Sequence, residues 1–170
     1  MSRAGHGIVL VLLGVAGLSG CAKDREHILA RGQAPAVSKP GVVFMVGGVG
    51  GTDFLGLAAQ WALPRADVPH EIRDFVWTHG TGRLLRDLQD TRHVLNKADE
   101  LVDEICKIKM ADPDRPVYLV GHSGGAGLVL ATAEQLPTGT LERLILLSAA
   151  VAPSYDLRPA LRATRGEIVS

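Results

Sequence analysis

The stretch from residue 117 to residue 135 constrains the fold of this chain most strongly. Four apolar residues, Val117 to Val120, run directly into Gly121-His122-Ser123-Gly124-Gly125, and a small-residue stretch follows from Ala126 to Gln135. A continuous apolar run is typical of a strand buried on both faces of a parallel sheet. Glycines on both sides of Ser123 permit a tight turn and close packing of a helix on the strand. The stretch therefore predicts a strand, a sharp turn and a helix.

The same alternation extends over most of the chain. Residues 90–110 carry apolar side chains at three- and four-residue steps, as in an amphipathic helix. Strand–helix alternation predicts an α/β fold with a doubly wound, mostly parallel sheet of about five strands and flanking helices. We expect strands at 42–46, 72–78, 117–121, 143–149 and from 167, and helices at 54–61, 90–110, 124–136 and 159–165.

Composition limits the classes of partner. The chain has 170 residues, a formal net charge of zero and 4% aromatic residues. One domain of this size can bury a core. Without a basic surplus or many aromatic side chains, a nucleic-acid partner is not expected.

The N-terminus carries a targeting pattern. Arg3 precedes an apolar run from Ile8 to Leu18, which is too short to span a bilayer as a helix. The run ends at Leu18-Ser19-Gly20-Cys21, which resembles the bacterial lipoprotein signal. An ordinary secretory signal or an N-terminal anchor helix is the alternative.

The lipoprotein interpretation divides the chain into a signal peptide at 1–20, a tether at 21–40 and a folded domain at 41–170. It implies cleavage before Cys21 and lipid chains on that cysteine, which would bind the protein to a membrane of the cell envelope. Ala22, rather than Asp, would favour the outer membrane in a Gram-negative cell. Cys106 would remain as a buried thiol.

A glycine-rich loop, Gly47 to Asp53, follows the first expected strand. A dinucleotide or phosphate loop is one interpretation, but the third glycine position holds Asp53 and no lysine supports a Walker loop. No cofactor is therefore expected. The loop could instead supply a backbone N–H to an oxyanion, or be a plain turn in which Asp53 caps the next helix.

Ser123, placed between strand and helix, resembles the nucleophile elbow of the α/β-hydrolase superfamily. The resemblance covers about residues 42–170, from that fold's third strand to the start of its seventh. It implies hydrolysis of a small ester or amide, with Ser123 as nucleophile and the N–H groups of Gly124 and Val49 as oxyanion donors. No metal site is expected, because Asp87, Asp90 and His93 would need further ligands that the sequence does not supply.

The rest of the expected apparatus is incomplete. The superfamily order is serine, acid, histidine, and no histidine follows His122. Asp156 is a candidate acid, or a plain loop aspartate, and His79 is a candidate base at another strand end. Three explanations fit: a C-terminally truncated chain, a non-catalytic envelope lipoprotein that binds a ligand or partner, or a base recruited from His79. Asp87, Asp90 and His93 could form a carboxylate–imidazole pair, but capping of a helix start explains them more simply.

Overall fold

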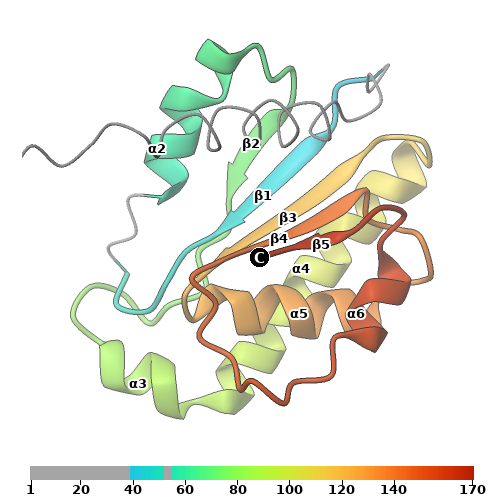
Figure 1. Cartoon of the computed structure of the whole chain (residues 1–170). Coiled ribbons are helices and arrows are strands. Elements are labelled where there is room, and N and C mark those ends of the chain that lie inside the picture. Colours follow the sequence, from blue (N-terminus) through green and yellow to red (C-terminus); the bar gives the residue numbers. More distant parts are fainter. Residues whose placement is uncertain (1–38, 52–54) are drawn as a thin grey trace, which may run out of the picture. The chain divides into compact units, whose positions relative to one another are not determined.

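The computed structural model describes residues 39–51 and 55–170 (Figure 1). The expected signal peptide, the lipidation site Cys21, most of the tether and the expected helix cap Asp53 lie outside these residues. No helix within the described ranges is both long and apolar enough to cross a membrane.

A five-stranded sheet forms the centre of the described part, and every strand pairing in it is parallel (Figure 1). The strand order is β2-β1-β3-β4-β5. The bounds are β1 Val42–Val46, β2 Glu71–Asp74, β3 Val117–His122, β4 Arg143–Leu147 and β5 Ile168–Val169. The order places β1 beside β3, so the loops that follow these two strands leave the sheet at the same edge.

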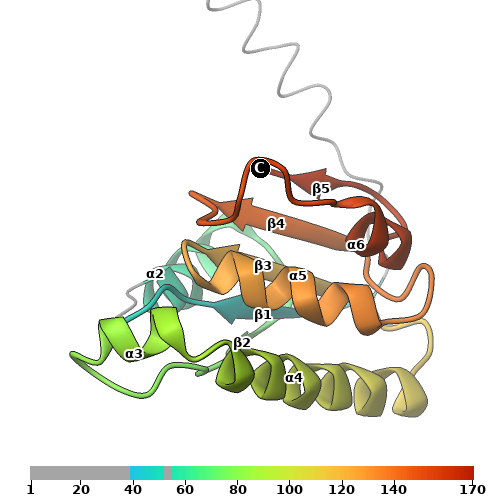
Figure 2. The ribbon, with the colours of Figure 1, turned by 90° about the horizontal axis from the view of Figure 1, so that it is seen from below.

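Helices lie on both faces of the sheet, which confirms the doubly wound α/β prediction. Figure 2 shows α4, α5 and α6 on one face and α2 on the other, with α3 beside the end of the sheet. The bounds are α2 Leu55–Ala62, α3 Leu84–Gln89, α4 Thr91–Ala111, α5 Gly125–Gln135 and α6 Arg158–Ala163, with a 3-10 turn at Pro64–Ala66.

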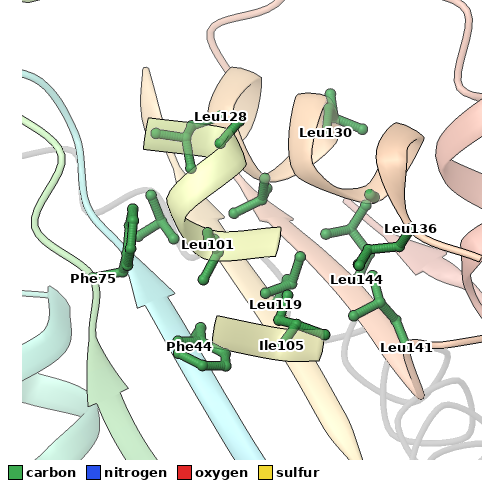
Figure 3. Close-up of a cluster of buried hydrophobic side chains, with 14 of the residues drawn as sticks. Phe44, Phe75, Leu101, Ile105, Leu119, Leu128, Leu130, Leu136, Leu141 and Leu144 are labelled. Atoms are coloured by element: carbon green, nitrogen blue, oxygen red, sulfur yellow. The ribbon is translucent and has the colours of Figure 1, made fainter. Parts of the chain in front are cut away.

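The main core lies between the sheet and the layer of α4 and α5 (Figure 3). In α4 the buried positions are Ala98, Leu101, Ile105 and Ile108, as the helical periodicity predicted. They pack in one cluster with Phe44 of β1 and Leu119 of β3. Each fully buried aliphatic or aromatic side chain contributes about 1.5–3 kcal/mol relative to exposure. This packing holds β1 and β3, and hence their terminal loops, in a fixed relation.

Several expected bounds were wrong. β2 was expected to extend to residue 78 but ends at Asp74. The Phe75 N–H still donates to the Met45 carbonyl, but beyond Met45 strand β1 has only Val46 left with which β2 could pair. β4 ends at Leu147 rather than 149, because Ser148 takes a positive φ of 47° that a strand does not allow. Helix α3 was not predicted, since its six residues are too few to show a period.

Candidate active site

Ser123 lies on a sharp turn between β3 and α5. Its φ is 52°, a left-handed conformation that is costly for a residue with a Cβ. The turn is held by its backbone: the Ser123 N–H donates to the Leu147 carbonyl at 3.0 Å, and its carbonyl accepts from Ala126 and Ala150, each at 3.1 Å. These bonds tie the serine to the ends of β4 and α5 and hold a strained elbow between strand and helix.

Contacts explain the glycines beside the serine. A Cβ on Gly121 would lie 2.5 Å from Val129 Cγ2, and one on Gly125 would collide with the carbonyl oxygens of Val46 and Gly47. Both glycines allow α5 to pack closely on the ends of β3 and β1.

The glycine-rich loop after β1 lies against the elbow. A Cβ on Gly48 would be 3.4 Å from Ser123 Cβ and 3.8 Å from Ser123 Oγ. A Cβ on Gly124 would be 2.8 Å from Val49 Cγ1. The structure therefore brings together Ser123, Gly124 and the loop that contains Val49. Gly124 is also next to the N-terminal end of α5, where the helix dipole favours negative charge.

Side chains of the β2–α3 region hold this loop at both ends. Trp77 Nε1 donates to the Gly47 carbonyl at 2.8 Å. At the other end, the Gly50 N–H donates to Asp87 Oδ2 at 2.8 Å. The Gly82 N–H also donates to the Gly50 carbonyl at 3.2 Å. The loop is thus fixed by segments that are remote from it in sequence.

His79 lies in this same region, bound to two carboxylates. Its backbone N–H and its Nδ1 contact Asp87 Oδ1 at 2.8 and 2.9 Å, and its Nε2 lies 3.3 Å from Asp90 Oδ2. Its ring lies against that of His93, with centroids 4.0 Å apart, and His93 Nε2 donates to the Trp77 carbonyl at 2.6 Å. Both ring nitrogens of His79 are thereby directed at carboxylates.

Asp90 also accepts from the His93 N–H at 3.0 Å and caps the start of α4, which confirms the capping interpretation. Burial raises the pKa of Asp87, but the N–H groups of His79 and Gly50 and the His79 side chain outweigh it, so that this pKa is lowered. The bond from the His93 N–H and the nearby His79 lower the pKa of Asp90. Both groups are therefore carboxylates at neutral pH. The described residues contain no group of three or more His, Cys, Asp or Glu side chains arranged to hold a metal ion.

Asp156 lies on the opposite side, in the loop between β4 and α6. Its carboxylate is half exposed and accepts three bonds from Arg158, from the backbone N–H at 3.0 Å, from Nε at 2.8 Å and from Nη2 at 2.9 Å. The Arg158 guanidinium lowers the pKa of Asp156 to about 2. The structure thus joins Asp156 to a neighbour in sequence, as in the plain-loop interpretation, and not to His79.

Trp77 and Asp87 were not singled out as loop supports from the sequence. Over the whole residue, Trp77 is 2% exposed and Asp87 is 3% exposed. Trp77 lies just after β2, so its place near the carboxyl edge was predictable, whereas Asp87 lies in α3, which was not predicted. Their partners Gly47 and Gly50 belong to another strand's loop, and sequence spacing carries no information on that pairing.

Solved structures with a similar fold include a cutinase-like protein and an acetylxylan esterase. A cutinase-like protein from Cryptococcus sp. superposes with a TM-score of 0.51 and 18% sequence identity, over 65% of this chain and 54% of that chain. An acetylxylan esterase superposes with a TM-score of 0.50 and 10% identity, over 78% of this chain and 81% of that chain. This chain therefore spans about half the length of the cutinase-like protein. The sequence itself matches no protein family and no curated protein significantly.

At these identities the likeness shows the fold alone. It agrees with the parallel sheet and its flanking helices, an α/β fold that the cutinase-like protein and the acetylxylan esterase share.

Proposed function

We propose that this protein is a serine hydrolase of small-molecule esters or amides, with Ser123 as the nucleophile. The observation that carries the proposal is the positive φ of Ser123 on a strand–turn–helix elbow, directly against a glycine loop and beside Gly124. Strain of this kind in a non-glycine residue is concentrated at functional sites.

In the proposed reaction, Ser123 Oγ attacks the carbonyl carbon of the substrate and its proton passes to a base. The carbonyl oxygen becomes an oxyanion, for which the N–H groups of Gly124 and Val49 are the proposed donors. The tetrahedral intermediate expels the alcohol or amine, which takes up the proton. Water then attacks the acyl-enzyme, releases the acid and restores the serine hydroxyl.

The reaction needs a base that accepts the Ser123 proton. His79 and Asp156 were the candidates, and their side chains contact Asp87, Asp90 and Arg158 in the structure. We propose that Ser123 and the N–H groups of Gly124 and Val49 react slowly by themselves. An oxyanion hole alone still gives roughly 10³-fold acceleration over water, so a measurable reaction is expected.

Labelling with a fluorophosphonate probe tests the proposal. The wild-type chain should be labelled at Ser123, and Ser123→Ala should abolish that labelling. Ser148→Ala is a matched control, because Ser148 also has a positive φ, at the end of the neighbouring strand β4. Equal labelling of wild type and Ser123→Ala would refute the serine mechanism and leave a non-catalytic binding role.

We also propose that Cys21 is lipidated and anchors the protein to the bacterial envelope, as the Leu18-Ser19-Gly20-Cys21 pattern suggests. Mass spectrometry of the mature N-terminus should then find an acylated cysteine. An uncleaved Met1 would refute the anchor.

A further inference from the structure

Asp87 is the charged side chain most thoroughly removed from solvent in the described part of the chain. Its side chain has 0% exposure, and Thr132 is the other buried polar residue there. Thr132 donates to Leu128 one turn back in its own helix, which needs no further explanation. A buried carboxylate is costly unless its oxygens are bonded. Asp87 must therefore be explained by the groups it binds.

Those groups belong to two other segments. Asp87 Oδ2 accepts from the Gly50 N–H at 2.8 Å, across 37 residues of sequence. Asp87 Oδ1 accepts from the backbone N–H of His79 at 2.8 Å and contacts Nδ1 of the same residue at 2.9 Å. Both oxygens of one carboxylate thus join the loop after β1 to the segment after β2. Such charge-assisted bonds are roughly twice as strong as neutral ones.

The bond to Gly50 acts on the peptide unit next to Val49. A peptide is planar, so fixing the Gly50 N–H fixes the plane that also contains the Val49 carbonyl. Gly50 and Gly51 have φ values of 90° and 69°, and glycine can leave these values at little cost. Without an external bond, the loop would sample other conformations. Asp87 supplies that bond at one end, as Trp77 does at Gly47.

We propose that Asp87 is a positioning residue that holds the 47–50 loop in the conformation of an oxyanion donor beside Ser123. This inference rests on the proposed serine hydrolase function. Asp87 itself does not touch the reacting atoms. It acts through Gly50, and its carboxylate remains ionised throughout the reaction.

The test is the kinetics of fluorophosphonate labelling, separated into the maximal rate and the half-saturating probe concentration. Asp87→Asn keeps the shape of the side chain but replaces one acceptor oxygen by a donor NH₂, so it cannot accept all three bonds. We expect the maximal labelling rate to fall roughly 10- to 100-fold, as for a misplaced oxyanion donor, with the half-saturating concentration unchanged. The rates are compared below the melting temperature of both proteins.

Two further variants separate positioning from general damage. Asp90→Asn is the matched control, since Asp90 also contacts His79 but has no bond to the loop. It should change the rate by less than about twofold. His79→Ala removes the Nδ1 contact and leaves the Gly50 bond, so its loss should be clearly smaller than that of Asp87→Asn.

An unchanged maximal rate in Asp87→Asn, or an equal loss in Asp90→Asn, would overturn the positioning role while the proposed function stands. Labelling that is independent of Ser123 in every variant would refute the proposed function, and the positioning role with it. If Asp87→Asn does not fold, hydrogen exchange of the Gly50 amide in the wild-type protein tests its bond to Asp87 instead. Slow exchange supports the bond, and exchange at the rate of an unfolded chain overturns it.

Discussion

The two sides of Ser123 at the carboxyl edge of the sheet differ in how their carboxylates are used. On the β2 side, Asp87 is buried and binds groups 8 and 37 residues away in sequence. On the β4 side, Asp156 is half exposed and binds Arg158, two residues away. A carboxylate can hold two segments together only if its partners lie on both of them, so only Asp87 can organise a loop.

The difference extends to the loops themselves. The 47–50 loop is bonded to Trp77, Asp87 and Gly82, and it lies against the elbow glycines. The loop after β4 reaches the elbow through the bond from the Ala150 N–H to the Ser123 carbonyl. Both loops are therefore bonded to remote segments, but among the described residues a buried carboxylate takes part only on the β2 side, where Asp87 binds Gly50.

Substitution of two glycines of α5 should show the largest difference between the two sides. Gly125 packs against the loop after β1, and Gly127 lies near the loop after β4. A Cβ on Gly125 would collide with the carbonyl oxygens of Val46 and Gly47, on the side of the loop after β1. We expect Gly125→Ala to lower the free energy of unfolding by about 3 kcal/mol, since backbone must move to admit the methyl group. Chemical denaturation of both proteins measures the change.

Gly127 is the matched control on the other side. A Cβ there would lie 4.0 Å from Val151 Cγ1, which is ordinary contact. Alanine is favoured over glycine within a helix, so Gly127→Ala should raise the free energy of unfolding by about 0.5–1 kcal/mol. Similar losses for both variants would show that the two sides pack against the elbow equally.

The backbone arrangement was largely predictable from the sequence. Residues 42–46 form β1, and the strand, turn and helix at 117–135 were correctly predicted, because continuous apolar runs and a glycine-flanked serine are local signals. The placement of the elbow beside Gly124 and Val49 was predicted from the resemblance to the α/β-hydrolase superfamily. The bonds from Asp87 and Trp77 to the glycine loop were not predicted, because no local pattern encodes which remote N–H or carbonyl a buried side chain will meet.

The pH dependence of stability should show the next largest difference between the two sides. The pKa of Asp87 is lowered below its ordinary value of 3.8 by the N–H groups that it binds. Well above pH 3.8 its carboxylate is ionised in the folded and the unfolded state, and its bonds contribute fully. As the pH falls, the unfolded chain takes up the proton first, and the contribution is lost as the pH falls through the folded pKa.

The measurement is the free energy of unfolding of wild type and Asp87→Asn at about pH 6 and again well below pH 3.8. Their difference isolates Asp87 from His79, His93 and Asp90, which also lie in this cluster. Asp87→Asn should be less stable by about 2 kcal/mol at the higher pH, with the gap closing at the lower. A difference in the free energy of unfolding that does not change with pH would mean that the charge of Asp87 does not stabilise the fold.

Asp156→Asn should have the smallest effect, although the pKa of Asp156 is lowered to about 2 by Arg158. Its carboxylate is half exposed and competes with water for the same guanidinium, so little stability depends on the pair. We expect thermal unfolding and Ser123 labelling to match those of wild type. A catalytic acid that orients a histidine would behave differently, because its loss costs roughly 10⁴-fold in rate. A fall of that size in the labelling rate of Asp156→Asn, but not of Arg158→Gln, would assign Asp156 to the reaction. It would also show that the β4 side of the elbow is as organised for catalysis as the β2 side.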